Sequence, residues 1–448
     1  MSDVVIKGAT LFESGRRFKS DLRISKGRIA EISREIAPRK ADTVVEADGK
    51  WLLPGMIDDH VHFREPGMEE KAEIFSESRA AARGGVTSVM EMPNTRPAAT
   101  TLELLEKKFA RAAEVSAVNY SFYLGATEKN AAEIKKLDGS KVCGVKLFMG
   151  ASTGDLLVDQ PAKLENIFES VSSLLAVHCE STPIVQANEE RFRRIHGDAV
   201  PFALHAQIRS AEACWRSSSL AIDLARKHGT RLHLLHVSTE RELTLLSPGP
   251  LAKKRITAEA TPAHLWFSDA DYARLEGRIK CNPSIKTRKD RDALRHAVRE
   301  GRIDLIGTDH APHLLAEKSN TYFNAPSGIP SVQEGLLLLL ELARKGLFTV
   351  EQVVERYAHA PATLFGIVDR GHLREGYRAD VVLVDPAANW IETRRDVASK
   401  CGWSPFEGET FRHKVLKTWV NGKLAWDDEN PEAEVAANGE RLEFLGRS

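Results

Sequence analysis

The chain has 448 residues, of which 63 are basic and 63 acidic, so its formal net charge is zero. That balance gives no overall field to attract nucleic acid or an anionic membrane, and we expect neither as a partner. The length favours one large catalytic domain with a smaller companion.

The first residues and the cysteines indicate where the protein works. Residues 1–8 lack the basic-then-apolar pattern of a signal peptide, and no apolar run reaches the roughly 20 residues of a membrane helix. The five cysteines form no CxxC pair and are odd in number, which is typical of reduced thiols. We therefore expect a cytoplasmic protein.

Short strand patterns occupy both ends of the chain. They cover residues 4–11, 21–25, 28–32, 378–385 and 415–423, and the last of them contains an Asn-Gly hairpin turn. Two β-rich ends around a different middle predict one small β-sandwich domain, assembled from residues 1–52 and 370–448.

The middle, residues 53–369, alternates apolar strands with amphipathic helices, which is typical of parallel α/β architecture. Strands are expected at 51–62, 86–93, 119–124, 142–149, 174–178, 231–236, 255–260 and 303–309. Helices are expected at 102–115, 206–228 and 290–299. Eight βα units predict a closed TIM-like (β/α)8 barrel, with its chemistry at the carboxyl ends of the strands.

Residues of the kind that bind metals recur at these strand ends. A spacing of two puts His60 and His62 on the same face of an extended chain. A single histidine on an apolar strand is more often a satisfied core residue, but the repeated coincidence favours a metal site. The candidates are His60, His62, Lys146, His178, His236 and Asp309. His233, three residues before His236, is left out.

This set exceeds the three protein ligands that one catalytic zinc usually takes. Two metals a few ångströms apart fit better, and they require a bridging anion. Lys146 lies in an apolar strand, where a lone ammonium is costly, so it either pairs with a carboxylate such as Asp155 or loses its charge by modification. Only a carbamylated lysine, which ends in a carboxylate, can bridge.

Two segments resemble the signatures of the cyclic amidases of the amidohydrolase superfamily, and those of dihydroorotases most closely. They are residues 58–67, Asp-Asp-His-Val-His-Phe-Arg-Glu-Pro-Gly, and residues 307–313, Gly-Thr-Asp-His-Ala-Pro-His, which are followed by Lys318. The resemblance extends over essentially the whole chain. It implies a reversible, metal-dependent cyclisation of N-carbamoyl-L-aspartate to L-dihydroorotate, a step of pyrimidine synthesis.

The resemblance also implies roles for the candidate ligands. His60 and His62 would bind the first of two divalent ions, with zinc as the expected metal, and His178 and His236 would bind the second. Carboxylated Lys146 would bridge the ions, although an aspartate bridges in some relatives and Asp155 is the nearest candidate. Asp309 would ligate the first ion and shuttle the proton.

A small anionic substrate follows from the same resemblance. Arg64 would grip its carboxylate, and Asn94 and His313 would complete the pocket. Asn282, Ser327 and Gly328 would lie against the ring, although Ser284-Ile285-Lys286 departs from the sequence that many relatives have after Asn-Pro. Three of these residues, taken alone, also have a structural explanation. Arg64 is compatible with an exposed turn, Asn94 with a turn after proline, and His313 with a helix cap.

Two other functions fit the same motifs. An allantoinase or hydantoinase would share the barrel and metals, and Arg64 discriminates because those substrates carry no carboxylate beside the ring. An inactive assembly subunit would be expected to have lost metal ligands. A homodimer is expected because symmetric dimers are the commonest oligomers.

Overall fold

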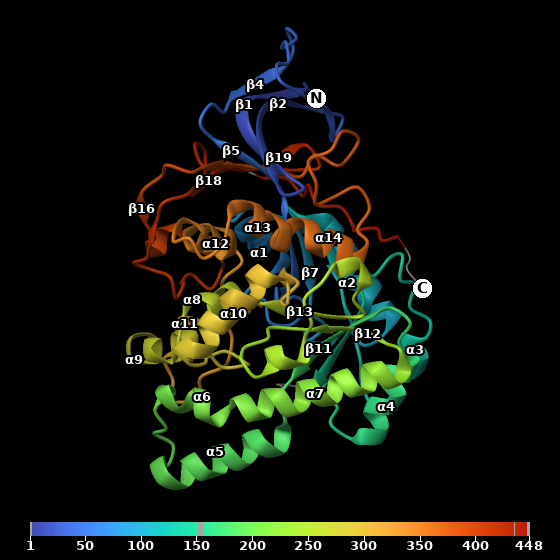
Figure 1. The fold of residues 1–448 in the computed structure, drawn as a ribbon, viewed down its shortest axis with the longest axis vertical. Coiled ribbons are helices and arrows are strands. Elements are labelled where there is room, and N and C mark those ends of the chain that lie inside the picture. Colours follow the sequence, from blue (N-terminus) through green and yellow to red (C-terminus); the bar gives the residue numbers. More distant parts are fainter. Residues whose placement is uncertain (1, 151–155, 434, 446–448) are drawn as a thin grey trace.

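The computed structural model describes residues 2–150, 156–433 and 435–445. A small sheet built from both ends of the chain stands above a barrel, with helices α1 (Ile74–Arg83) and α13 (Val350–Val354) lying just beneath that sheet (Figure 1). None of the described helices is both long and apolar enough to cross a membrane.

The small sheet has the strand order β19-β18-β15-β5-β1-β2-β3, with β4 added beside β1. Strand β5 pairs parallel with β1 and antiparallel with β15, and it thereby joins the two ends of the chain in one sheet. Apolar side chains from each part, such as Leu11, Leu52 and Val381, pack in one cluster. The strands are β1 (Val4–Glu13), β2 (Arg16–Ser25), β3 (Arg28–Ser33), β4 (Thr43–Glu46), β5 (Trp51–Pro54), β15 (Val381–Asp385), β18 (Lys414–Val420) and β19 (Lys423–Asp427).

The barrel strands pair in parallel, in chain order. They are β6 (Met56–Val61), β7 (Val86–Glu91), β8 (Asn119–Phe122), β9 (Leu124–Gly125), β10 (Val145–Met149), β11 (Leu174–Cys179), β12 (Arg231–Leu234), β13 (Ile256–Ala260) and β14 (Leu305–Ile306). Strands β8 and β9 continue one another, so the ring has the expected eight positions. It closes where the His62 backbone N–H donates to the His310 carbonyl at 2.7 Å. The predicted fold class is confirmed.

Helices cover the outside of the barrel, mostly with one buried apolar face. Helix α7 (Ala211–His228) begins where the Ser210 hydroxyl accepts from the Ala213 N–H, and it ends at Gly229 in the left-handed conformation. The others are α2 (Leu102–Val115), α3 (Ala131–Ile134), α4 (Pro161–Ser170), α5 (Thr182–His196), α6 (His205–Ile208), α8 (Pro262–Trp266), α9 (Tyr272–Leu275), α10 (Arg288–Glu300), α11 (Leu315–Lys318), α12 (Gly335–Arg344) and α14 (Ala360–Phe365). Two short strands, β16 (Trp390–Ile391) and β17 (Thr410–Phe411), form a separate pair.

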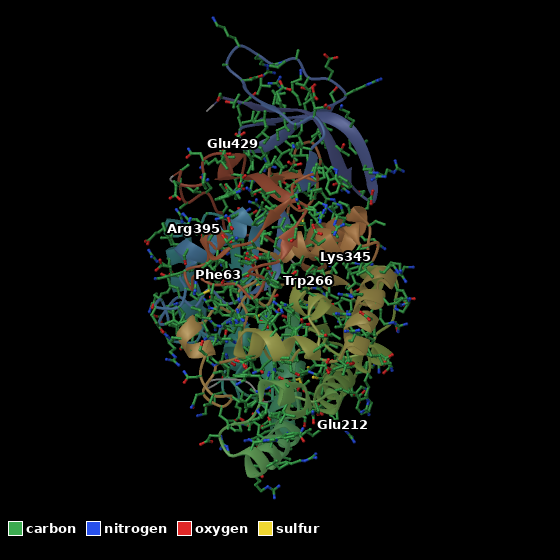
Figure 2. The ribbon with its side chains drawn as sticks, turned by 90° about the vertical axis from the view of Figure 1, so that its left-hand side faces the viewer. Phe63, Glu212, Trp266, Lys345, Arg395 and Glu429 are labelled. Carbon is green, nitrogen blue, oxygen red and sulfur yellow. The ribbon has the colours of Figure 1, made fainter. Side chains whose placement is uncertain are left out.

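Side chains tie these helices together at the surface. Lys345 follows α12, and its Nζ lies 4.2 Å from the centre of the Trp266 ring at the end of α8, as the neighbouring labels in Figure 2 show. Such a cation–π contact contributes about 0.5–1 kcal/mol at an exposed site. Glu212, on α7, lies in the lower part of the view in Figure 2, whereas Glu429, which follows β19, lies in the upper part.

Several predicted elements differ from the structure. The expected strand 51–62 breaks at Gly55, where β5 joins the small sheet and β6 the barrel. A Cβ at Gly55 would lie 2.0 Å from Thr87 Oγ1, so the chain crosses β7 too closely for any side chain. The expected helix 206–228 divides into α6 and α7. The expected strand 303–309 is regular only over β14, because Asp309 has a φ of 50° and turns out of the extended conformation.

Candidate metal centre and binding pocket

A cavity of about 590 Å³ lies at the carboxyl ends of the barrel strands. All the site residues expected from the sequence line it, although they come from segments far apart in the chain. These residues are His60, His62, Arg64, Asn94, Lys146, His178, His236, Asn282, Asp309, His313, Ser327 and Gly328. Their grouping shows that they share one cavity, while their individual roles stay predictions.

Three of these side chains form one candidate ligand group. Nε2 of His60 lies 3.2 Å and Nε2 of His62 lies 3.1 Å from Asp309 Oδ1. Ligand atoms that share an ion at bond lengths of about 2.1 Å lie about 3.0–3.4 Å apart, so this spacing fits a metal. On the far side of the rings, Glu259 Oε1 is 2.6 Å from Nδ1 of His60, and Asn94 Oδ1 is 2.7 Å from Nδ1 of His62.

Those bonds behind the rings decide which nitrogen faces the cavity. Each Nδ1–H donates backwards, so each Nε2 directs its lone pair toward Asp309. Burial lowers the pKa of His62 to about 4 and keeps it neutral, as a metal ligand must be. Burial acts in the same direction on His60, but the Glu259 and Asp309 carboxylates outweigh it and raise the pKa of His60. A bound cation would offset this local negative charge.

A second pair of histidines faces the same cavity. Nδ1 of His178 and Nε2 of His236 lie 3.0 Å apart, again the spacing of two ligand atoms around one ion. Burial lowers the pKa of both imidazoles. Behind the first ring, Glu180 Oε2 lies 3.2 Å from Nε2 of His178. The donor set therefore fits a second divalent ion beside the first.

Lys146 lies on β10 and is almost completely buried. Burial lowers its pKa to about 8. Its Nζ lies 4.5 Å from the centre of the Phe148 ring, and it forms no ion pair with a carboxylate in the part of the chain that the structure describes. Asp155, the alternative bridging residue, lies outside the described residues. A buried amine of lowered pKa in this place fits the expected carboxylation.

Three residues of the cavity adopt backbone conformations that are uncommon outside glycine. The φ angles are 70° at Arg64, 36° at His236 and 50° at Asp309. Left-handed backbone in such residues costs about 1–3 kcal/mol and is found mainly at functional sites. Packing elsewhere in the barrel offsets that cost and holds these side chains toward the cavity.

A buried guanidinium defines the other side of the cavity. Arg64 Nε donates to the Pro312 carbonyl at 3.0 Å, and Nη2 lies 3.1 Å from Nε2 of His313. Burial lowers the pKa of Arg64 to about 10, so the group stays charged at neutral pH. Among the described residues it makes no ion pair with a carboxylate. Lys71, which the sequence reasoning missed, donates to Nδ1 of His313 at 3.2 Å.

The loop that contains Ser327 and Gly328 is held by a buried lysine. Lys318 Nζ donates to the carbonyls of Lys280, Pro326 and Gly328, each at 2.8 Å. Ser327 donates nothing there, but its carbonyl accepts from Nε2 of His313 at 3.1 Å. In the sequence, Lys318 stands out only as a residue that follows the second signature. Opposite the loop, buried Asn282 Oδ1 has no hydrogen-bond partner among the described residues and can accept from a ligand N–H.

Glu259 is the other residue that the sequence reasoning missed. It lies within β13 and is completely buried. One of its oxygens accepts from Nδ1 of His60 and from the backbone N–H of His236, at 2.6 and 2.9 Å. The available signal was an acidic residue inside an otherwise apolar strand, where an unpaired carboxylate is costly.

Comparison with known proteins agrees with this geometry. A family model described as "Amidohydrolase family" matches residues 51–425. The dihydroorotase of Halobacterium salinarum is 34% identical over 436 residues, which cover 96% of this chain and 98% of that protein. The allantoinase of Bacillus velezensis is 32% identical over 432 residues, with coverage of 95% and 94%.

A solved structure extends the agreement to the whole fold. The L-hydantoinase from Arthrobacter aurescens superposes with a TM-score of 0.91 at 26% identity, covering 99% of this chain and 100% of that one. The match to the family model spans most of the barrel and part of the small sheet. Sequence, fold and the position of the cavity all lead to one assignment: the chain belongs to the amidohydrolase family.

Proposed function

We propose that this protein is a dihydroorotase, which interconverts L-dihydroorotate and N-carbamoyl-L-aspartate. The observation that carries the proposal is Arg64, a buried cation that lines the cavity without a carboxylate partner among the described residues. A buried charge that lacks a partner costs several kcal/mol, so the cavity favours an anionic ligand. Dihydroorotate supplies a carboxylate beside the ring amide.

Members of the amidohydrolase family are generally metal-dependent, and the side chains of this cavity fit two divalent ions, for which we propose zinc. His60, His62 and Asp309 would hold the first ion, and His178 and His236 the second. Such ions, when bound, lower the pKa of water and polarise the amide carbonyl.

Lys146 would bridge the two ions as its carboxylated form. Carboxylation consumes a neutral amine, because the nitrogen lone pair attacks carbon dioxide and one proton is released. With a pKa of about 8, roughly one Lys146 side chain in ten is neutral at pH 7. An exposed lysine has far less of the neutral form at that pH.

The side chains themselves bind the substrate and move the proton. Arg64 makes charge-assisted hydrogen bonds to the substrate carboxylate. Because Asn94 Oδ1 is engaged by His62, the amide N–H2 of Asn94 is left to donate to the same carboxylate. Asp309 takes the proton of the attacking water and passes it to the ring nitrogen as the amide opens. Cyclisation reverses these steps and consumes a proton, so lower pH favours the ring at equilibrium.

A substrate panel tests this proposal. Hydrolysis of L-dihydroorotate is measured beside allantoin and dihydrouracil, with metal content determined on the same sample. We expect turnover of dihydroorotate alone, in protein that carries metal. Turnover of an uncharged ring instead would refute the substrate assignment while leaving the family assignment intact.

The second candidate is an allantoinase or hydantoinase, supported by the allantoinase relative and by the L-hydantoinase structure. The buried Arg64 argues against it, because an uncharged ring would leave the guanidinium unpaired. An inactive subunit is less well supported, since every candidate ligand lines the cavity.

We further propose a cytoplasmic homodimer. The described cysteines are all free and buried, which suits a reducing compartment. The dimer rests on the frequency of two-fold symmetric oligomers. Light scattering on a size-exclusion column, which gives the molar mass of the eluting species, checks it.

A further inference from the structure

Three clusters of histidine and carboxylate have the atom spacing of a metal site among the described residues. The pocket cluster is His60, His62 and Asp309, already discussed. The joint cluster is Glu13, His359 and His372, where the small sheet meets the barrel. The core cluster is Asp59, His233 and Glu259, inside the barrel. Spacing alone does not distinguish them, but their hydrogen bonds do.

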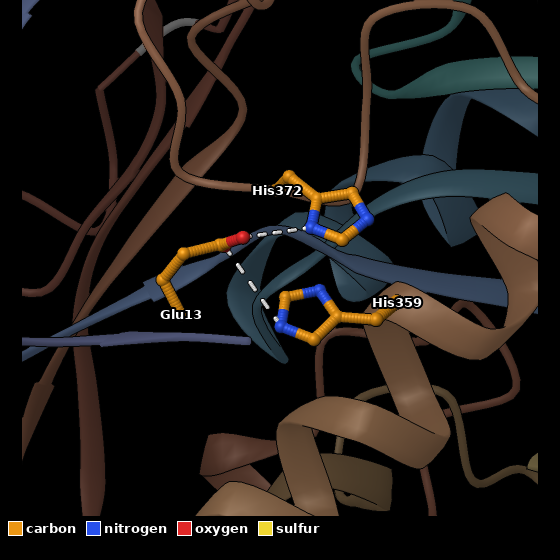
Figure 3. Close-up of side chains that lie close together, drawn as sticks. All are labelled: Glu13, His359 and His372. Atoms are coloured by element: carbon orange, nitrogen blue, oxygen red, sulfur yellow. Dashed lines mark hydrogen bonds and ion pairs between the residues drawn. The ribbon is translucent and has the colours of Figure 1, made fainter. Parts of the chain in front are cut away.

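The joint cluster has its ligand atoms already engaged (Figure 3). Nδ1 of His372 donates to Glu13 Oε1 at 2.9 Å, and the Leu373 N–H donates to Oε2 at 2.9 Å. Both nitrogens of His359 are also used: Nδ1 donates to the Gly371 carbonyl at 2.7 Å, and Nε2 accepts a backbone N–H at 3.2 Å. Few lone pairs are left for an ion, so these residues form a structural hydrogen-bond network.

The core cluster has the opposite character. Asp59, His233 and Glu259 have no exposed surface. Both carboxylate oxygens of Asp59, Oε2 of Glu259 and Nε2 of His233 lack a hydrogen-bond partner among the described residues. Buried polar atoms in folded proteins are almost always satisfied, and each unsatisfied one costs about 1–3 kcal/mol. Four such atoms that face one another indicate a missing ligand.

The orientation of His233 makes that ligand a cation. The Thr257 hydroxyl donates to the Leu232 carbonyl at 3.2 Å, so its oxygen accepts from Nδ1–H of His233 at 2.9 Å. In the neutral ring, Nε2 then carries a lone pair. This lone pair points at two carboxylates, with 3.4 Å to Asp59 Oδ2 and 3.5 Å to Glu259 Oε2. With the ring in its neutral form, three electron-rich atoms therefore lie close together.

Burial lowers the pKa of His233, but the Asp59 and Glu259 carboxylates outweigh it and raise this pKa to about 9. A proton on Nε2 is therefore the simpler explanation while no ion is bound, but the distances disfavour it. Charge-assisted N–H···O bonds are about 2.7–2.9 Å long, shorter than both separations here. The separations match ligands around a tetrahedral ion with bonds of about 2.1 Å, which lie about 3.4 Å apart.

The backbone leaves room at this point. A Cβ on Gly307 would lie 2.6 Å from Glu259 Oε2 and 2.8 Å from Asp59 Oδ1, so only glycine fits against the cluster. Asp59 is on β6, whereas the other two are on β12 and β13, which do not pair with β6. The cluster therefore spans the interior of the barrel.

We propose that Asp59, His233 and Glu259 form a third cation site, selective for a divalent ion of the zinc type and buried beneath the pocket. Asp59, His233 and Glu259 each supply one ligand atom, and three protein ligands are the number that many zinc ions take. Glu259 would bind this ion through Oε2, while its Oε1 accepts from Nδ1 of His60. The Glu259 carboxylate therefore connects this site with the pocket cluster. The third site goes beyond the proposed function and does not depend on the substrate.

Anomalous X-ray scattering from crystals of the zinc-loaded, unmutated protein tests the site directly. Data collected on both sides of the zinc edge should show a peak among Asp59, His233 and Glu259, separate from peaks in the pocket. Absence of that peak in crystals whose pocket does contain zinc would overturn the proposal. The dihydroorotate assay is independent of this result, so either proposal can fail alone.

Metal content of variants provides the second test. Asp59→Asn keeps the side-chain volume and removes the charge, and we expect it to bind one zinc fewer per chain than the unmutated protein. Glu13→Gln, the same chemical change in the joint cluster, should leave the count unchanged. Equal zinc content in Asp59→Asn and the unmutated protein would refute the site. If Asp59→Asn does not fold, the scattering experiment decides.

Discussion

The pocket cluster and the joint cluster contain the same residue types, two histidines and one carboxylate, yet they do different things. In the pocket, hydrogen bonds engage Nδ1 of His60 and of His62 from behind and leave each Nε2 facing Asp309. In the joint, hydrogen bonds engage the Glu13 oxygens and both nitrogens of His359. Residue type and spacing therefore do not define a metal site; free lone pairs that converge on one point do.

The largest effect is expected from Asp309, the proposed base of the pocket cluster. Asp309→Asn keeps the size of the side chain but cannot take a proton, and general-base catalysis contributes roughly 10²–10⁴-fold to rate. We expect kcat for dihydroorotate hydrolysis to fall by about 10³-fold. Glu13→Gln is the matched change in the joint cluster and should alter kcat less than threefold. A similar loss in both variants would contradict the distinction between the clusters.

The next effect concerns the substrate carboxylate. Arg64→Met removes the buried cation while it keeps an unbranched side chain, and loss of one partner of a buried charge pair costs about 2–5 kcal/mol. We expect kcat/KM for dihydroorotate to fall by roughly 10²-fold or more.

Arg96→Met is the control for Arg64→Met, because Arg96 lines the same cavity but is exposed. A solvated cation contributes little, so kcat/KM should change less than tenfold. If dihydroorotate turnover survived in Arg64→Met, the carboxylate assignment would be wrong.

A smaller effect is expected from the groups behind the ligands. Asn94→Ala leaves His62 in place but removes the oxygen that fixes its ring, and such changes weaken metal binding about 10–100-fold. Competition with a chromogenic chelator measures the affinity. His372→Gln in the joint should leave the affinity unchanged. Unaltered zinc affinity in Asn94→Ala would mean that the ring is held by other contacts.

That the candidate site residues line one cavity could be predicted because parallel strands bring their carboxyl ends to one side of a barrel. Polar residues such as His60, His178 and His236 could therefore be placed together without knowledge of any contact. The residues that support the histidines could not be predicted in this way, because packing across the barrel decides which carboxylate accepts a hydrogen bond from which imidazole ring. Glu259 is 199 residues from His60 in the chain, and no local pattern connects them.

The boundaries of elements were less predictable for a related reason. The run from Trp51 to His62 is apolar throughout its first half, and its pattern does not show that the chain changes sheets at Gly55. The change follows from the closeness of Thr87 on β7, which only the folded structure provides. Likewise, the apolar run before Asp309 does not show that this residue adopts a φ of 50° and turns out of the extended conformation.

The smallest effect is expected in the joint cluster, on stability rather than catalysis. Burial alone would raise the pKa of Glu13, but hydrogen bonds from His372 and Ser14 hold it down to about 2. The ionised carboxylate is thus favoured in the folded state, and Glu13→Gln should lower the free energy of unfolding by about 1–2 kcal/mol at pH 7. Urea unfolding monitored by circular dichroism measures it.

The pH dependence of that difference identifies its cause. A carboxylate whose pKa is depressed by folding stabilises the protein above its unfolded value, near 4.5, and loses this contribution as pH falls toward the folded value of about 2. The gap between the unmutated protein and Glu13→Gln should therefore be constant from pH 6 to 7 and shrink below about pH 4.5. If this difference in the free energy of unfolding stayed constant down to pH 3, the side-chain packing of Glu13, and not its charge, would stabilise the joint cluster.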